Sequence, residues 1–498
     1  MEENSQGLQP HPKDPIPTNT TQPGGKQKLK KLLKLKRTWA IAAVIVLIGV
    51  GAGFLAMRKE SQNVITLPDG TKKELSLEET AYTGVAADVL TNQTMECKPR
   101  GKNEWYRTDH TLVVDHKNPN ILYVSVEHIG IFKSIDGGKT WVQKTKGIKV
   151  YARADDTTKG CYGEYPVIRM DPKDNKHLVI GLSGGGGGFL DATTPNSQVG
   201  GVYQTFDGGE SWQLMINNKM NIYVTDVAID PSNPENVYYG TSSSPASWGG
   251  SDQNKLYVTT GLIYHTANSG KSWVELPTGI GKKSSASTVM INPANGKEIV
   301  APTFSADRES ADGSGTGIST GKDTSGAQLG VLRTNDGGKS WTSTQLPGSL
   351  PIVNGYFSER NFKNMFFVAF NTGPAVGYVS QDAGKTFKTT NYMDFVAYDP
   401  HDSQGRHVVG YSTTAGTPTL PSLNLFHSTD GGLTWTATGT LPKEITNLND
   451  HKVRPSKIVW HPTDKNTLYM SGAGGHVWKT TDLGQSWTTL LDLNKLTD

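Results

Sequence analysis

Cysteine is almost absent from this sequence of 498 residues, which contains two, Cys97 and Cys161. Neither lies in a C-x-x-C pair or in another spacing typical of metal ligands, and the sequence has no H-E-x-x-H element. The Asp-rich loops also lack the alternating spacing of a calcium loop. The sequence therefore requires no metal ion and predicts no cofactor.

The sequence is compatible with two redox states of these cysteines. Both follow the hydrophobic segment described below, so a disulfide between Cys97 and Cys161 could form if that part of the chain is extracytoplasmic. Two unlinked thiols are the alternative.

Net charge is also small. The formal charge is +3, of which residues 1–37, with eight Lys and Arg and three Asp and Glu, contribute +5, so residues 38–498 carry −2. Nucleic-acid binding requires a clustered basic face. The near-neutral main part of the chain therefore argues against nucleic acid as a partner.

Long hydrophobic runs are rare, and one stands out. Residues 39–57 contain no charged side chain. At about 1.5 Å per residue, a helix of this length nearly crosses a membrane core of about 30 Å. Seven cations precede it, Lys26, Lys28, Lys30, Lys31, Lys34, Lys36 and Arg37. The positive-inside bias predicts a single-pass anchor in the cell membrane at 38–57, a cytoplasmic tail at 1–37 and an extracellular remainder that begins with a linker at 58–105.

A cleaved signal peptide is the alternative to the anchor, because Gly51, Ala52 and Gly53 are small residues of the kind found near cleavage sites. The apolar run continues beyond them to Met57, which favours the uncleaved anchor. No cysteine follows the segment directly, and this excludes a lipoprotein anchor.

Seven segments of the chain fit one template, [Ser/Thr]-x-[Asp/Asn]-x-Gly-x-[Ser/Thr]-[Trp/Phe]. They begin at Ser134, Thr205, Thr266, Thr334, Ser380, Ser428 and Thr480. The third position holds Asp136, Asp207, Asn268, Asp336, Asp382, Asp430 and Asp482. A side-chain oxygen there can bond the backbone of a tight turn, and glycine permits positive φ. Each segment predicts a hairpin turn, here called a repeat turn, and the single Asn268 indicates a structural role rather than acid–base chemistry.

A second pattern precedes the repeat turns: an apolar strand, a turn such as Asp-Pro, and another strand, as in residues 168–180 and 227–239. It is degraded near 356–370. Together with a third strand and the strand after the repeat turn, this makes one four-stranded blade. The abundance of glycine, tryptophan and tyrosine suits a β protein rich in turns. We therefore predict an all-β, seven-bladed β-propeller at 106–492, preceded by the one transmembrane helix.

The repeat turns are spaced by 71, 61, 68, 46, 48 and 52 residues, so the early blades contain insertions. These lie at 183–201, 242–261 and 303–330. Long inserts are either binding loops or connecting segments without a binding role. The Ser, Thr, Gly and Asp content of the third insert favours a connecting segment.

The repeat turns resemble those of the Asp-box, or bacterial neuraminidase repeat, propellers over residues 110–490. That superfamily includes sialidases, xyloglucan-type glycoside hydrolases, the sortilin ectodomain and the photosystem II assembly factor. In these relatives the box lies at the blade periphery, away from the central site. The resemblance therefore implies the fold and says little about function.

Catalytic signatures of these relatives are absent or altered. The Arg-Ile-Pro element of sialidases does not occur. The run 123–130 is similar to the segment that carries the catalytic acid of the xyloglucan-type hydrolases, and the resemblance places Glu127 at that position. Those enzymes are longer, with two propellers and a cleft between them that one propeller cannot form.

A glycosidase needs a second carboxyl group, roughly 5–5.5 Å or 6.5–9.5 Å from the first. The candidates are acids expected where inner strands begin, near the axial mouth: Asp109, Glu164, Asp226 and Asp394. Arg107, Arg454 and His451 are expected nearby. Polar groups that simply stay solvated at a channel mouth are the alternative, and the sequence does not select a pair.

We expect a monomeric, non-catalytic binding module for a protein or a cell-envelope glycan. The alternative is a glycoside hydrolase of the xyloglucanase kind, using Glu127 with Asp109, Asp226 or Asp394. A third possibility, by analogy alone, is an assembly factor for a membrane complex, which predicts an Arg-rich face.

Overall fold

The structure of the chain is a computed structural model. It describes residues 64–66, 72–74, 82–83, 112–126, 130–148, 164–183, 201–217, 223–242, 263–279, 284–305, 330–369, 375–412, 423–446 and 453–493. The expected anchor at 38–57, both cysteines, and the candidates Asp109 and Glu127 lie outside these residues. Within the ranges given, no helix combines the length and the apolar character that membrane crossing requires.

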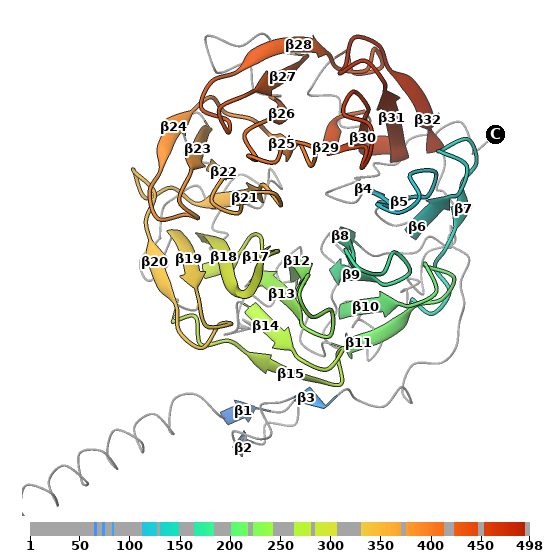
Figure 1. Ribbon diagram of the computed structural model, residues 1–498. Coiled ribbons are helices and arrows are strands. Elements are labelled where there is room, and N and C mark those ends of the chain that lie inside the picture. The colour runs from blue at the N-terminus through green and yellow to red at the C-terminus, as the bar shows by residue number, and fades with distance from the viewer. Residues whose placement is uncertain are drawn as a thin grey trace, which may run out of the picture. The chain divides into compact units, whose positions relative to one another are not determined.

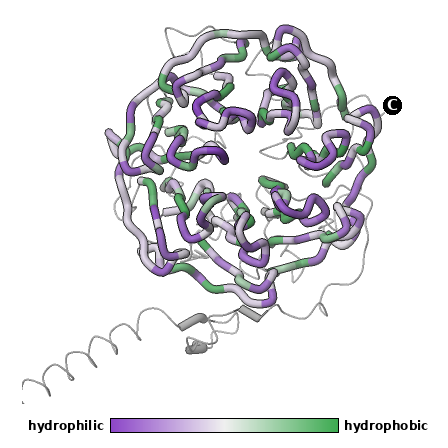
Figure 2. Tube along the Cα trace, in the orientation of Figure 1, coloured by the Kyte–Doolittle hydropathy of each residue, from purple (hydrophilic) through white to green (hydrophobic). Residues whose placement is uncertain are grey.

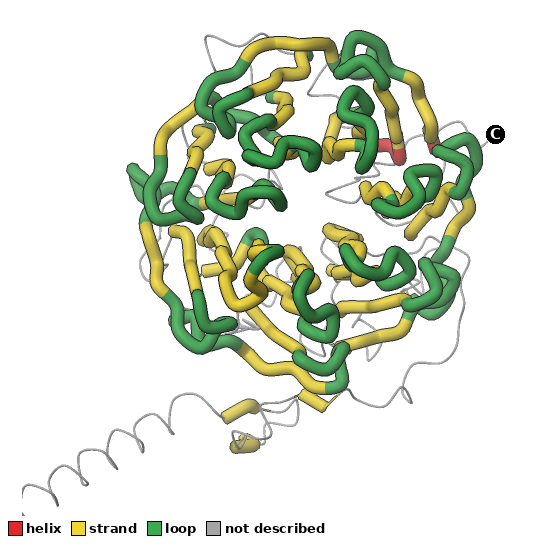
Figure 3. The backbone as a smooth tube through the Cα atoms, viewed as in Figure 1, coloured by secondary structure: helices red, strands yellow, loops and turns green. Residues whose placement is uncertain are grey.

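The chain divides into two compact units, Met1–Glu79 and Thr80–Asp498. In the first, β1 (Val64–Thr66) pairs with β2 (Lys72–Glu74) in an antiparallel ribbon. The second contains seven antiparallel sheets among its described residues. Figure 1 shows them as blades around a central axis, and Figure 3 shows that strands and loops make up nearly all of the ring.

The first three blades have the following strands. Blade 1 contains β4 (Leu112–Val114), β5 (Leu122–Val126), β6 (Gly130–Ser134) and β7 (Val142–Gln143). Blade 2 contains β8 (Glu164–Met170), β9 (Leu178–Ser183), β10 (Gly201–Thr205) and β11 (Gln213–Asn217). Blade 3 contains β12 (Tyr223–Ile229), β13 (Val237–Ser242), β14 (Ile263–Thr266) and β15 (Ser272–Glu275), and β3 (Tyr82–Thr83) pairs with β15 at its edge.

The other four blades complete the ring. Blade 4 contains β16 (Ser284–Ala286), β17 (Met290–Asn292), β18 (Asn295–Ser305), β19 (Gly330–Thr334) and β20 (Thr342–Thr344). Blade 5 contains β21 (Ile352–Phe357), β22 (Met365–Ala369), β23 (Val376–Ser380) and β24 (Lys388–Thr390). Blade 6 contains β25 (Phe395–Tyr398), β26 (Val408–Tyr411), β27 (Asn424–Ser428) and β28 (Thr436–Thr440). Blade 7 contains β29 (Pro455–Trp460), β30 (Leu468–Gly472), the short 3-10 helix η1 (Ala473–Gly475), β31 (His476–Thr480) and β32 (Thr488–Leu491).

Strand order within the blades follows the chain, from the innermost strand to the outermost. The predicted all-β, seven-bladed propeller is confirmed. Blade 5 is regular although its sequence pattern is degraded, because Ser358 takes the place of the usual Asp and its backbone N–H still bonds Asn364 O. Blade 4 departs from the template, since β16 and β17 both pair with the long β18.

Apolar side chains pack between neighbouring blades rather than within them. Seven clusters of buried residues occupy the interfaces between successive blades. Figure 2 shows hydrophobic positions alternating with hydrophilic ones along the blades. The ring closes in the same way, because Leu112 and Val124 of blade 1 pack with Val477 and Leu491 of blade 7. Each described blade is built from consecutive strands, so this closure depends on side-chain packing.

Four hydrogen bonds close the repeat turn of blade 1. Ser134 Oγ donates to Asp136 Oδ1 (2.8 Å) and accepts from Gly138 N (2.8 Å). Thr140 donates its N–H to Asp136 Oδ1 (2.9 Å) and its hydroxyl to Oδ2 (2.7 Å). Equivalent contacts occur in the other six turns. In blade 3 the last bond reverses, since Asn268 Nδ2 donates to Ser272 Oγ (2.8 Å).

Four of the seven aromatic residues that end the repeat turns bond a neighbouring blade, a role that the sequence did not reveal. Trp212 Nε1 donates to Lys144 O (2.9 Å) and Trp487 Nε1 to Thr440 O (2.8 Å), in each case a carbonyl of the preceding blade. Trp141 of blade 1 reaches Leu490 O of blade 7 (3.2 Å). These indoles therefore join neighbouring blades, including the first and the last.

Substitutions at Asp430 separate turn bonding from charge. Asp430→Ala removes the acceptor for Ser428 Oγ, Leu433 N and Thr434 N, so we expect a loss of about 1–2 kcal/mol in unfolding free energy. Asp430→Asn should cost much less, because Asn268 makes the same backbone bond. Urea denaturation of both variants checks this. Equal destabilisation by alanine and asparagine would contradict it.

Acid should weaken the repeat turns. Hydrogen bonds from Thr140 lower the pKa of Asp136 from 3.8 to about 2, and those from Ser486 lower that of Asp482 to about 2. A lowered folded-state pKa means that the stabilisation is complete above the ordinary value and is lost as the pH falls toward 2. We expect the midpoint of thermal unfolding to drop between pH 4 and pH 2, with a smaller drop in a variant carrying Asp482→Asn. Calorimetry over this range measures it, and a midpoint that is flat there in the parent protein would contradict the expectation.

Candidate axial site

Several polar and charged side chains lie on or next to the innermost strands of the blades. We call six of them the axial cluster: Arg169, Asp226, Tyr356, Asp394, Arg454 and Lys457. They come from β8, β12 and β21, from the segment before β25, and from β29 and the segment before it. Figure 1 shows these strands facing the centre of the ring.

An irregular register in the innermost strands helps to position the cluster. Strands β8, β12, β21 and β29 each shift register against the second strand of the blade, for example between Val224 and Asp226 and between Pro455 and Ile458. Such bulges redirect the side chains beside them. Asp226 and Lys457 both lie at the shift, four residues before the turn residues Asp230 and His461.

Asp226 is buried and holds three donors. Its Oδ1 accepts from Arg169 Nη2 (2.7 Å) and from Val227 N (3.0 Å), and its Oδ2 accepts from Val289 N (2.9 Å). Burial raises the pKa of this carboxyl, and the Arg169 guanidinium acts in the opposite direction. Because its partners come from blades 2 and 4, the carboxylate of blade 3 ties three blades together at the axis.

Asp394 is buried near the start of β25. Its Oδ1 accepts from Tyr392 Oη (2.8 Å) and lies 3.6 Å from Arg454 Nη2. The hydroxyl of Tyr356 donates to the backbone carbonyl of Asp394 (3.2 Å). Asp394 is therefore held by groups from blades 5, 6 and 7.

The pKa of the Tyr356 hydroxyl is affected by groups from both ion pairs of the axial cluster. Burial raises the pKa of its hydroxyl, Asp394 adds to that effect, and Arg169 opposes it. Its ring meets that of Phe395 edge to face, with centroids 6.3 Å apart. Both rings are partly exposed although they lie on innermost strands, so solvent reaches this part of the axis.

Lys457 is a second cationic side chain of the axial cluster, and its amine is affected by the charge of Arg169. The pKa of its amine is lowered from 10.5 to about 7, chiefly by burial and then by the charge of Arg169, while Asp226 and Glu359 oppose the shift. The side chain is nevertheless partly exposed. Both facts fit a residue that is partly exposed as a whole while its amine is buried among neighbouring groups.

The five candidate acids from the sequence fall into three groups. Asp226 and Asp394 lie in the axial cluster, each with an arginine, in blades 3 and 6. Asp109 and Glu127 lie outside the described residues, so their catalytic role stays a prediction, as it does for the other two. Glu164 begins β8, where its backbone pairs with Ser183.

Lys457 and Tyr356 were missed in the sequence, whereas Arg454 was expected near the axis. Lys457 interrupts the apolar strand 455–460, and it stands as far before its turn residue as Asp226 does in blade 3. An alignment of the seven inner strands on their turn residues could have found it. Arg360 lies outside the cluster, exposed on a turn, where its Nε donates to Pro400 O (2.6 Å).

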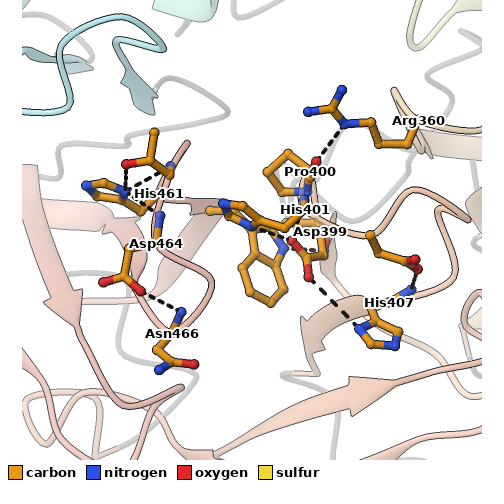
Figure 4. A network of polar contacts seen from close by, with 12 residues as sticks. Arg360, Asp399, Pro400, His401, His407, His461, Asp464 and Asn466 are labelled. Atoms are coloured by element: carbon orange, nitrogen blue, oxygen red, sulfur yellow. Dashed lines mark hydrogen bonds and ion pairs between the residues drawn. The ribbon is translucent and has the colours of Figure 1, made fainter.

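A separate network of Asp and His occupies the turns of blades 6 and 7 (Figure 4). Asp399 Oδ1 lies 2.7 Å from His401 Nδ1, and His407 lies 4.0 Å from the other oxygen. His461 replaces the turn-forming Asp of other blades, since its Nδ1 accepts from Thr463 N (3.2 Å) and Asp464 N (3.0 Å). Among the described residues no group of three His, Cys, Asp or Glu is arranged to hold a metal. The network closes turns.

Comparison with known proteins gives distant likenesses. No model of a protein family matches the chain. A probable oligoxyloglucan-reducing end-specific xyloglucanase from Neosartorya fischeri is 22% identical over 306 residues, which cover 56% of this chain and 33% of the relative. The chain spans about a third of the length of the curated relatives it matches.

Comparison with solved structures also gives distant likenesses. The GH74 xyloglucanase from Xanthomonas campestris superimposes with a TM-score of 0.52 at 13% identity, covering 78% of this chain and 56% of that one. YCF48 from Cyanidioschyzon merolae gives a TM-score of 0.46 at 15% identity, covering 76% of this chain and 98% of that one. The first likeness supports the propeller fold and nothing finer.

Proposed function

We propose that this protein is a non-catalytic binding module, a propeller that presents its axial region to a glycan. A protein or cell-envelope glycan follows from the sequence as the ligand class. The likeness to a relative named as a xyloglucanase favours the glycan. No catalytic step is included in this proposal.

The observation that carries it is the state of Asp226. Both of its oxygens already accept hydrogen bonds, from Arg169, Val227 and Val289. A general acid must carry a proton and reach the leaving-group oxygen, and a general base must reach a water. A buried carboxylate whose lone pairs are directed at protein donors is suited to joining blades.

A glycoside hydrolase is the second candidate function, and the xyloglucanase likeness favours it. Its site would combine Glu127 with Asp109 or Asp394. In that case the binding region proposed above would be the substrate site of an enzyme.

A glycan array with product analysis separates the two functions. The full-length protein in detergent would be applied to plant and bacterial cell-wall glycans, with binding and released oligosaccharides both measured. We expect binding without turnover. Turnover that is lost in Glu127→Gln and kept in Glu235→Gln, an exposed control in blade 3, would establish the hydrolase instead. Binding to a protein ligand with no glycan binding would overturn the ligand class.

Membrane attachment forms the second part of the proposal. Residues 38–57 would anchor the chain with its N-terminus in the cytoplasm and its propeller outside the cell, and the chain would act as a monomer. Their apolar composition and the preceding cations support this. Fractionation of cells that express the full chain or a 38–57 deletion tests it, with added protease as the probe of sidedness. A soluble full-length chain would reject the anchor.

The repeat turns also support a place among the Asp-box propellers. Their internal hydrogen bonds involve the residue types of that template, Ser or Thr, Asp or Asn, and Gly. We propose this assignment for the fold, separately from the function.

A further inference from the structure

The turn that follows the innermost strand has an asparagine or aspartate at one recurring position in every blade. The side-chain Oδ1 of this residue accepts a hydrogen bond from the backbone N–H two residues later, as Asn295 does from Lys297 N (3.3 Å) in blade 4. The equivalent residues of the other blades are Asn118, Asp174, Asn233, Asn361, Asp402 and Asp464. This bond folds the side chain back over the following peptide, which brings its carbonyl carbon toward the next backbone nitrogen.

The residue after this position decides which of the four asparagines can react with its own backbone. Pro119 and Pro234 follow in blades 1 and 3, and proline has no N–H with which to attack a carbonyl. Phe362 follows in blade 5, where its buried side chain fixes the peptide. In blade 4 the next residue is Gly296, which has an N–H and no side chain to hinder ring closure.

Gly296 is required by its neighbour in blade 3. The Asp230 carboxylate occupies the space in which a side chain would begin, so a Cβ at Gly296 would collide with both carboxylate oxygens. Asp230 is itself held by Ser232 N (2.8 Å) and Asn236 Nδ2 (3.0 Å). Asn295, in contrast, is exposed to solvent. Packing between blades 3 and 4 therefore places a glycine directly after an exposed asparagine.

We propose that Asn295 is a site of spontaneous deamidation and backbone isomerisation. The nitrogen of Gly296 attacks Cγ of Asn295, so a C–N bond forms and the Cγ–Nδ2 bond breaks. The departing amide nitrogen takes the proton of the Gly296 nitrogen and leaves as ammonia, which produces a five-membered succinimide. Water then opens this ring at either carbonyl to give aspartate or isoaspartate. The hydrogen bond from Lys297 N to Oδ1 stabilises the negative charge that develops on that oxygen.

The other Asn-Gly pair of the sequence, Asn354 and Gly355, is protected by its place in the fold. Asn354 is half-buried in the innermost strand β21. The N–H of Gly355 donates to Thr288 Oγ1 (3.1 Å), so the attacking nitrogen is held away from the side chain. The two pairs have the same sequence, and the structure predicts different rates for them.

The two products are expected to differ in their effect on the turn. Aspartate keeps the backbone bond, since Asp174, Asp402 and Asp464 already make it in blades 2, 6 and 7. Isoaspartate adds one carbon to the backbone next to Gly296, where Asp230 leaves no space. We expect isoaspartate at this position to weaken the contact between blades 3 and 4, and aspartate to leave it intact.

Storage of the full-length protein in detergent at pH 6 and pH 8, with peptide mass spectrometry at intervals, tests the proposal. Trypsin releases residues 284–297, in which the other asparagine, Asn292, precedes a proline. We expect this peptide to gain the mass of an amide-to-acid change and to contain isoaspartate. The change should be faster at pH 8, because the attacking nitrogen must lose its proton. Asn354 should react at least tenfold more slowly, and Asn118 and Asn233 should stay unchanged.

Urea provides the matched control, because Asn295 and Asn354 should react at similar rates once the fold is lost. If Asn295 reacts in urea and not in the folded protein, the fold protects it and the proposal is overturned. Equal rates for both residues in the folded protein would reject the protection by strand β21. Deamidation of Asn118 or Asn233 would contradict the imide route.

A substitution separates the effects of the two products. Asn295→Asp supplies aspartate without isoaspartate, so this variant should unfold at the temperature of the fresh parent protein, whereas stored parent protein should unfold at a lower one. Stored protein that contains isoaspartate and unfolds as the fresh protein does would reject the effect on blades 3 and 4. These measurements need no ligand, so they stand or fall independently of the glycan-binding function.

Discussion

Asp226→Ala is expected to lower the free energy of unfolding by about 3–5 kcal/mol, a large effect for a single carboxylate. The substitution leaves the Arg169 guanidinium without its partner and the N–H groups of Val227 and Val289 without their acceptor. Removing one member of a buried ion pair costs more than the pair contributes, because the remaining charge stays desolvated. Urea denaturation followed by tryptophan fluorescence measures the change.

A double variant identifies the cause of that loss. Arg169→Met in the Asp226→Ala background removes the unpaired cation, so it should recover part of the stability that the single variant loses. Glu235→Ala, at an exposed turn of blade 3, should change the unfolding free energy by less than about 0.5 kcal/mol. If Asp226→Ala matches this exposed control, the carboxylate does not join the blades.

The repeat architecture could be predicted from the sequence because each blade repeats the same local chemistry. Ser134, Asp136, Gly138 and Thr140 bond one another within a few residues, so their spacing alone defines the turn. Blade 5 shows the limit of reading by pattern, since Ser358 supports the turn that Asp supports elsewhere. Packing between blades, such as that of Leu112 against Leu491, involves residues far apart in the chain and has no sequence signature.

The axial cluster could be predicted only in part for the same reason. The strand pattern indicated that Asp226 and Asp394 start inner strands near the axis. The partner of Asp226 could not be predicted, because Arg169 lies 57 residues before it in the chain. Arg454 was expected near the axis, but its pairing with Asp394 of the preceding blade could not be predicted. Lys457 looked like a polar interruption of an apolar strand. Its lowered pKa depends on burial and on the charge of Arg169, a residue that is distant in the sequence.

These contacts show that an acidic residue near a propeller axis can have a structural role. An acid at the start of an inner strand suggests catalysis when it is considered alone. Asp226 instead accepts hydrogen bonds from three protein donors, which occupy both of its oxygens. This arrangement suits a carboxylate that joins blades better than one that donates a proton.

Lys457→Met should stabilise the protein, and the gain should depend on pH. The pKa of the amine is about 7 in the folded chain, against an ordinary value of 10.5. The folded state therefore bears the cost of a charged amine below pH 7, and as the pH rises from 7 toward 10.5 that cost is relieved by deprotonation, so the parent protein gains stability relative to the variant. Each tenfold change in the proton dissociation constant corresponds to about 1.4 kcal/mol. Partial exposure reduces the total, and we expect the variant to be more stable by about 1–3 kcal/mol at pH 6.

Thermal unfolding at pH 6, 8 and 10 measures this gain, which should shrink steadily toward pH 10. Lys388→Met provides the matched control, because it makes the same chemical change at an exposed site and should show no pH-dependent difference from the parent. A constant gain at all three pH values would mean that methionine simply packs better and that the amine is not desolvated. A gain that shrinks as the pH rises would show instead that burial of the charged amine lowers the stability of the folded protein.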